Sequence, residues 1–149
     1  MKKDVDLFKA HLDVDVATKL VREVLESGFI NEGVQVTQLT TEMSRILRTK
    51  QVVLVNSCTS ALTMALKLSG VEPGDDVITT SMTCVATNMP IKHLGANIVW
   101  ADVDPDNGML TADTIDAAIT PKTKAVMVVL WAGNPFDLQR INDLCQSKG

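Results

Sequence analysis

The residues from Asn56 to Leu62 combine small hydroxyl side chains with the start of an apolar helical pattern. This segment follows the apolar run Val52–Val55 and leads into the helical spacing of Ala61–Leu68. A buried strand that turns through small residues into a helix leaves unpaired backbone N–H groups at the helix N-terminus. These groups and the positive end of the helix dipole together favour a phosphate or another oxyanion.

Three hydroxyl side chains of this segment could add contacts to such an anion: Ser57, Thr59 and Ser60. The alternative is an ordinary helix cap, because Ser and Thr are favoured at N-cap positions whether or not a ligand binds. By itself the segment therefore indicates either a phosphate anchor or a cap.

The apolar runs from residue 51 onward predict strands that alternate with helices. The predicted strands are Val52–Val55, Val77–Thr80, Ile98–Ala101 and Ala125–Leu130, and the helices that follow them are Thr59–Leu68, Val85–Leu94, Thr111–Ile119 and Asp137–Ser147. This order predicts an α/β fold, a three-layer α/β/α sandwich around a mainly parallel sheet. Because such sheets bind ligands at the carboxyl ends of their strands, we expect one shared rim at residues 56–60, 81–87, 102–106 and 131–135.

The first 50 residues have a different pattern. Amphipathic helices are predicted at Asp15–Glu26 and Val34–Leu47, separated by a turn at Gly28–Gly33. We therefore predict a helical arm over residues 1–50 and βα repeats over residues 51–149.

Composition and charge narrow the classes of function. With 46% hydrophobic residues among 149, the chain can bury a core, and its net charge of −4 argues against a nucleic-acid partner. The sequence shows no secretory leader and no apolar run long enough to cross a membrane. An odd set of cysteines without CxxC spacing (Cys58, Cys84 and Cys145) indicates reduced thiols and a cytoplasmic protein. His11 and His93 lack the spacing of a zinc site, so no metal is expected there.

Several motifs together resemble one family. They are Leu25–Gly33, Asn56–Leu62, Ser69–Asn88, Leu94–Asp106 and Ala118–Val126. In order and spacing they resemble the DegT/DnrJ/EryC1/StrS family, the fold-type I pyridoxal-phosphate sugar aminotransferases, over roughly residues 12–149. The resemblance implies the large, cofactor-binding domain of that fold and pyridoxal 5′-phosphate as cofactor.

The resemblance also implies roles for individual residues. Cys58 and Thr59 match positions whose backbone N–H groups, with the Thr hydroxyl, hold the cofactor phosphate, and Ser57 shapes the turn before them. Cys84 stands where the family usually carries an aromatic residue packed on the pyridine ring, so either weaker cofactor binding, by roughly 0.5–1.5 kcal/mol beyond area burial, or a differently packed ring is expected. Asp102 is expected near the cofactor end of the rim.

Other polar residues on the expected rim allow simpler interpretations. An Asp-rich turn is favoured over a divalent-ion site for Asp104 and Asp106, since the calcium-loop pattern is absent. Asn88, near a helix start, is explained by capping at least as well as by binding. Leu130 and Ala132 replace the His and Tyr that the family often carries, so the substrate pocket is expected to differ.

The family works as a homodimer, and the resemblance places Gly28–Gly33 near the active site of a neighbouring subunit. Exposed Phe29 and Ile30 would suit such an interface. The alternative is a hydrophobic staple for the helix that follows.

The full-length enzyme implied by the resemblance moves an amino group from a small-molecule donor to a nucleotide-linked keto-sugar. The family's Schiff-base Lys and pyridine-binding Asp match nothing here, so we expect a truncated large domain that lacks the small C-terminal domain and is inactive. One alternative is a non-catalytic phosphate-ligand-binding or regulatory α/β module. A nucleotide-binding domain is another, although GxGxxG and GxxxxGK[ST] are absent. A third is an incomplete gene product whose exposed apolar surface self-associates.

Overall fold

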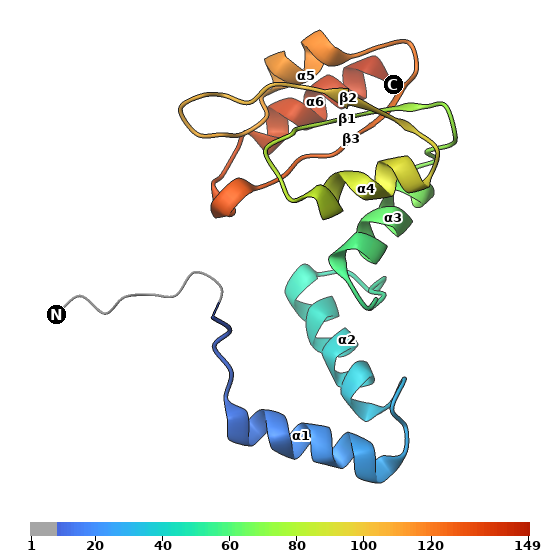
Figure 1. The fold of residues 1–149 in the computed structure, drawn as a ribbon, viewed down its shortest axis with the longest axis vertical. Coiled ribbons are helices and arrows are strands. Elements are labelled where there is room, and N and C mark those ends of the chain that lie inside the picture. Colours follow the sequence, from blue (N-terminus) through green and yellow to red (C-terminus); the bar gives the residue numbers. More distant parts are fainter. Residues whose placement is uncertain (1–8) are drawn as a thin grey trace, which may run out of the picture. The chain divides into compact units, whose positions relative to one another are not determined.

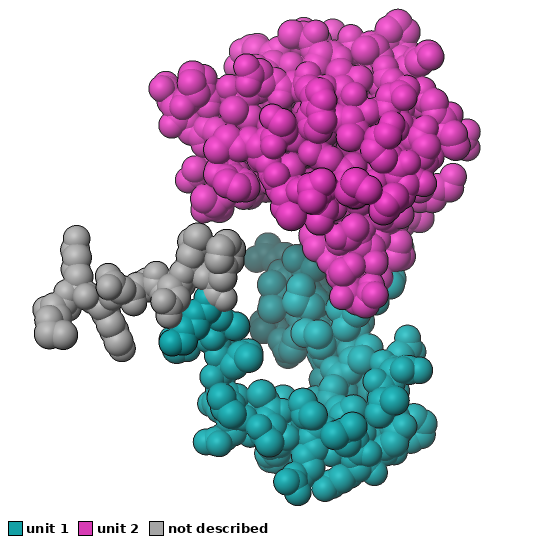
Figure 2. Space-filling view, viewed as in Figure 1, with its two compact units in different colours: residues 1–54 teal, residues 55–149 magenta. Residues whose placement is uncertain are grey.

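The computed structural model describes residues 9–149, so residues 1–8 of the predicted arm lie outside the described part. The chain divides into two compact units, residues 1–54 and residues 55–149 (Figure 2).

The described part of the first unit, residues 9–54, contains two helices, α1 (Val14–Ser27) and α2 (Val34–Leu47). The carboxylate of Asp13 caps α1 by accepting a hydrogen bond from the backbone N–H of Val16 at 3.0 Å. Gly28 ends α1 in the left-handed conformation (φ 74°) that glycine adopts without strain. Neither helix has a buried residue, so the apolar side of each is exposed in this unit.

The second unit alternates helices and strands. Its elements in chain order are α3 (Cys58–Leu68), β1 (Asp76–Thr79), α4 (Val85–His93), β2 (Asn97–Trp100), α5 (Ala112–Ala118), β3 (Thr123–Val126), a short 3₁₀ helix (Trp131–Gly133) and α6 (Leu138–Lys148). The strands form a parallel sheet in the order β2-β1-β3. Val77 of β1 lies opposite Ile98 of β2 and Ala125 of β3.

Side chains of β1 alternate between two hydrophobic cores, as the period of a strand requires. Val77 packs with Leu66 of α3 and Ile91 of α4, whereas Ile78 packs with Ile115 of α5 and Ile141 of α6. Figure 1 shows α3 and α4 on one face of the sheet and α5 and α6 on the other. The predicted α/β/α sandwich with a parallel sheet is confirmed.

Two strand predictions were wrong. Val52–Val55 has no strand partner among the described residues, and Val53 is 72% exposed; apolar residues alone supply no partner for the backbone hydrogen bonds of a strand. The last strand is Thr123–Val126, earlier than the predicted Ala125–Leu130. The first two residues of this strand, Thr123 and Lys124, are polar, so a search for apolar runs does not detect where the strand begins.

The amino ends of all three strands are joined through the buried carboxylate of Asp76. It accepts hydrogen bonds from the Thr120 hydroxyl, just before β3, at 2.6 Å, and from the Asn97 amide of β2 at 3.0 Å. The Thr120 bond, the Asn97 bond and the charge of Lys122 lower the pKa of Asp76 below its ordinary 3.8, against the opposing effect of burial.

We predict that Asp76→Asn flattens the acid limb of the stability profile. A carboxyl group whose folded-state pKa is lowered stabilises the fold above its unfolded pKa, and this stabilisation is lost as the pH falls through the folded pKa. Denaturant unfolding at several pH values should therefore show a variant that is less stable at pH 7, with a deficit that shrinks below about pH 4. Asp106→Asn, the same charge change in an exposed turn, is the control. An equal deficit at every pH would contradict this account.

Candidate functional site

The N-terminus of α3 is capped by its own hydroxyl side chains. Ser57 is the N-cap residue, and its hydroxyl oxygen accepts a hydrogen bond from the backbone N–H of Ser60 at 3.1 Å. The Ser60 hydroxyl in turn donates to the side-chain oxygen of Asn56 at 2.8 Å. The capping interpretation therefore accounts for both serine side chains.

Two backbone N–H groups remain available beside this cap. Within the described part of the chain, the N–H groups of Cys58 and Thr59 make no hydrogen bond, and neither does the Thr59 hydroxyl as a donor. They lie in the first turn of an eleven-residue helix, where the helix dipole favours negative charge. This turn can therefore offer two amide donors and one hydroxyl donor to an oxyanion.

Cys84 lies at the N-terminus of the neighbouring helix α4, which packs against α3. It is the N-cap residue, is exposed and makes no side-chain capping hydrogen bond. The connection before it is held by other residues, because the hydroxyl of Thr83 donates to that of Thr87 at 2.9 Å. The Cys84 thiol is therefore accessible at the start of α4.

Asp102 follows β2 and is exposed. One of its carboxylate oxygens accepts a hydrogen bond from the backbone N–H of Val103 at 2.8 Å, and Asp104 accepts one from the N–H of Asp106 at the same distance. These are local turn contacts of the kind Asp commonly makes. No grouping of three or more potential metal-ligating side chains occurs among the described residues.

The loops that follow the three strands meet at Gly108. A Cβ atom placed on this glycine would lie 3.2 Å from Cε of Met82, which follows β1, and 3.9 Å from Cδ1 of Trp131, which follows β3. The amide of Asn134 also donates to the carbonyl of Asn107 at 3.4 Å. Because Gly108 also has φ 72°, a larger residue there would be strained, and the flexible end of the Met82 side chain would have to shift slightly. From the sequence alone, Asp104 and Asp106 of this loop were interpreted only as part of an Asp-rich turn.

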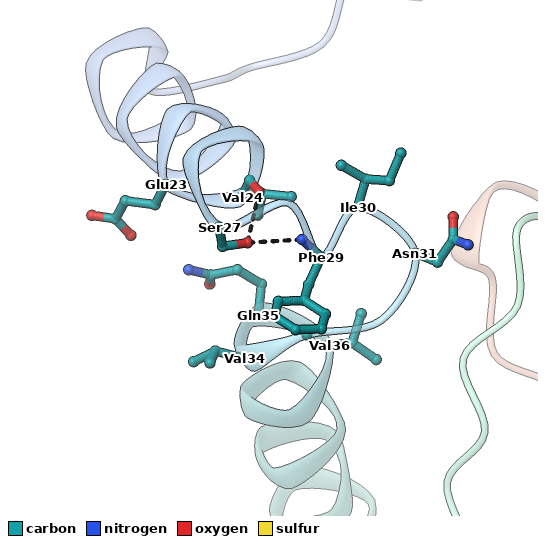
Figure 3. A pocket seen from close by; sticks show the side chains of 10 residues that line it. Glu23, Val24, Ser27, Phe29, Ile30, Asn31, Val34, Gln35 and Val36 are labelled. Carbon is teal, nitrogen blue, oxygen red and sulfur yellow. Dashed lines mark hydrogen bonds between the residues drawn. The ribbon is translucent and has the colours of Figure 1, made fainter.

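The first unit contains a separate open cavity of about 650 Å³ where α1 turns into α2 (Figure 3). Phe29 and Ile30 line it and are 72% and 68% exposed, so they do not form a buried staple. The Ser27 hydroxyl braces the turn by donating to the Val24 carbonyl at 2.7 Å and accepting from the Phe29 N–H at 3.1 Å. The remaining lining residues are Glu23, Asn31, Gly33, Val34, Gln35 and Val36.

Asn88 does not cap α4, which is one of the two roles considered from the sequence. It is 8% exposed, and its amide faces the end of β1 instead of capping α4. The sequence does not predict that Asn88 is buried, because its burial depends on how α4 packs on the sheet. Among the described residues, no helix is long and apolar enough to cross a membrane.

Comparison with known proteins adds a family relationship. The family model for the DegT/DnrJ/EryC1/StrS aminotransferase family matches residues 13–149. The spore coat polysaccharide biosynthesis protein SpsC of Bacillus subtilis is 41% identical over 129 residues, which cover 87% of this chain and 33% of that protein.

Solved structures agree with this relationship. The sugar aminotransferase CalS13 from Micromonospora echinospora matches with a TM-score of 0.87 and 36% identity, over 97% of this chain and 39% of that one. The pyridoxal-phosphate form of the putative sugar aminotransferase Spr1654 from Streptococcus pneumoniae matches with a TM-score of 0.85 and 33% identity, over 91% of this chain and 34% of that one.

The chain thus spans about a third of the length of the curated relative that it matches. The match of the family model nonetheless extends over both units of the structure and includes every residue of the candidate site. This chain belongs to the DegT/DnrJ/EryC1/StrS aminotransferase family.

Proposed function

We propose that this chain contributes the phosphate-binding part of the cofactor site in a pyridoxal-phosphate-dependent sugar aminotransferase. The observation that carries the proposal is the N-terminus of α3, where the N–H groups of Cys58 and Thr59 have no partner within the described chain. Family membership supports the identity of the cofactor, and the solved relative Spr1654 has a pyridoxal-phosphate form.

The residues present fit a phosphorylated ring. Cys58 and Thr59 donate backbone N–H groups to the phosphate, the Thr59 hydroxyl adds a charge-assisted hydrogen bond, and Ser57 fixes the turn as N-cap. Cys84 offers a small polarizable side chain to the ring, and Asp102 offers a carboxylate at the end of β2. When bound, pyridoxal phosphate supplies an aldehyde that can take up an amino group and a ring that withdraws electrons.

The lysines of residues 55–149 lie away from the carboxyl ends of the strands. Lys67, Lys92 and Lys148 are in the last turns of α3, α4 and α6. Lys122 and Lys124 are at the amino end of β3. We therefore propose that this chain alone does not transfer amino groups. For the whole protein we propose transfer from a small-molecule amino donor to a nucleotide-linked keto-sugar, in line with the sugar aminotransferases among its relatives.

We propose further that the chain acts in the cytoplasm. All three of its cysteines are free and exposed, which suits a reducing compartment.

We predict that the chain binds pyridoxamine 5′-phosphate and that Thr59→Val weakens this binding roughly tenfold or more. A hydrogen bond to a charged group contributes about 1.5–3 kcal/mol, and valine removes only the hydroxyl. Isothermal titration calorimetry measures the affinity, and this amine form cannot react with surface lysines. Thr63→Val is the matched control, since Thr63 lies one turn further along α3 and donates to the Thr59 carbonyl.

Pyridoxamine without its phosphate tests the same site from the ligand side. The proposal requires much weaker binding of this compound. Equal affinity for the two ligands, or equal losses in Thr59→Val and Thr63→Val, would refute a phosphate site at α3.

We predict that Cys84→Phe tightens binding of pyridoxamine 5′-phosphate by about 2- to 12-fold. An aromatic pair contributes roughly 0.5–1.5 kcal/mol beyond the area that it buries, and phenylalanine restores the ring that the family usually carries here. The same titration measures the change. Cys145→Phe, at another exposed cysteine, should leave the affinity unchanged. Looser binding in Cys84→Phe would show that the thiol does not face the ring.

We propose that the protein is a homodimer and that the turn between α1 and α2 takes part in the contact. Phe29 and Ile30 line an apolar cavity there and remain largely exposed, as in surfaces that a partner covers. This is also where the family resemblance expects the neighbouring subunit.

Ile30→Asp is therefore predicted to raise the dimer dissociation constant at least tenfold, because a buried unpaired charge opposes association. Sedimentation equilibrium measures it. Leu138→Asp, an exposed leucine at the start of α6, should leave the dimer intact. A monomeric wild-type chain, or equal weakening by the two variants, would reject this interface.

A further inference from the structure

Buried polar side chains join the carboxyl end of β1 to helix α4. Thr79 and Thr80 are 0% and 3% exposed, and Asn88 is 8% exposed. The Thr79 hydroxyl donates to the side-chain oxygen of Asn88 at 3.0 Å, and the Asn88 amide donates to the Thr80 carbonyl at 3.0 Å. We call Thr79, Thr80 and Asn88 the strand–helix network.

This network is costly unless it serves a geometric purpose. Burying an amide and a hydroxyl costs free energy that their mutual hydrogen bonds only roughly offset, and apolar side chains of similar size would pack here without that cost. Such a network defines the relative position of the elements that it joins, because hydrogen bonds fix the distance and angle between their groups. The network therefore sets the position of α4 relative to the end of β1.

The connection between β1 and α4, which the strand–helix network holds in place, is short and contains Cys84. Only residues 80–84 separate β1 from α4, and Cys84 is the last of them. Within it the Thr80 hydroxyl accepts a hydrogen bond from the backbone N–H of Met82 at 3.0 Å. Because Cys84 makes no side-chain capping hydrogen bond, its placement depends on its neighbours.

Asn88 reaches across this connection. It lies four residues after Cys84, one turn into α4, and bonds back to Thr79 at the end of β1 and to Thr80, the first residue of the connection. We infer that Asn88 is a positioning residue, which holds the first turn of α4 and thereby Cys84 in place at the candidate cofactor site. The effect of Asn88 on ligand binding rests on the proposed function, whereas its effect on the position of Cys84 does not.

The direct test places a nitroxide spin label on Cys84 in a chain whose other cysteines are changed to serine. Asn88→Leu keeps the size of the side chain but removes both hydrogen bonds, so the mobile fraction of the Cys84 spectrum should rise at least twofold. Thr79→Val should have the same effect, and Thr79→Ser, which keeps the hydroxyl, should restore the parent spectrum. Thr79→Val also decides the question if Asn88→Leu does not fold.

A second label separates positioning from general loosening of the fold. With the nitroxide on Cys145 of α6 instead, Asn88→Leu should leave the spectrum unchanged. Unchanged spectra at both positions, or equal changes at both, would overturn the inference. Ile115→Val, a trimmed core residue on the opposite face of the sheet, should also leave the Cys84 label unaffected.

Binding of pyridoxamine 5′-phosphate is a separate test of the role of Asn88 at the cofactor site. If the parent chain binds pyridoxamine 5′-phosphate, Asn88→Leu should weaken that binding at least threefold, and an unchanged affinity would overturn the positioning role at the cofactor site. If the parent chain does not bind it, the proposed phosphate site fails, while the label spectra still decide whether Asn88 positions Cys84.

Discussion

The second unit depends on β1, a parallel strand that must be paired on both edges and covered on both faces. All four of its residues are buried, and it pairs with β2 on one side and β3 on the other. A central parallel strand cannot be left partly solvated, because its backbone groups and both rows of side chains need partners. The two helical layers follow from that requirement, since Val77 and Ile78 point to opposite cores.

Polar residues are used at the two ends of this strand for different purposes. At the amino end, the charged Asp76 joins the starts of three strands through Thr120 and Asn97. At the carboxyl end, neutral Thr79 bonds to Asn88 of a helix. The first arrangement holds the starts of the three strands together. The second sets where a helix begins, and helix beginnings carry the candidate site.

The sequence predicted what depends on local pattern. The sandwich and the helices of both units follow from apolar spacing and from stop signals such as Gly28, and α2 was predicted to the residue. Prediction failed where the outcome depends on partners. Val52–Val55 has the composition of a strand but no strand beside it in the described chain, and Thr123 has a polar side chain but pairs with Asp76.

The same limit applies to the candidate site. Residue types at 57–60 indicated either an anion site or a helix cap but could not show which atoms were free, because a hydroxyl that caps a helix looks identical in sequence to one that binds a ligand. Asn88 was recognised as polar and near a helix start, and only packing shows that it is buried against β1.

At the start of α3 the serine hydroxyls make the capping hydrogen bonds and two backbone N–H groups make none within the described chain, and this difference has a chemical consequence. Ser57 and Ser60 use their hydroxyls on each other and on Asn56, so they stabilise the helix start and leave the backbone N–H groups of Cys58 and Thr59 as donors for the proposed anion. Every residue type except proline has the same backbone N–H donor, so a thiol at position 58 would leave the proposed anion contact unaltered. Identity matters instead at Thr59, whose hydroxyl is free to donate, and at Cys84, whose side chain is the part that would meet a ring. On the proposed function, selectivity for a phosphate would therefore persist even where contacts to the rest of the ligand differ from those of the family.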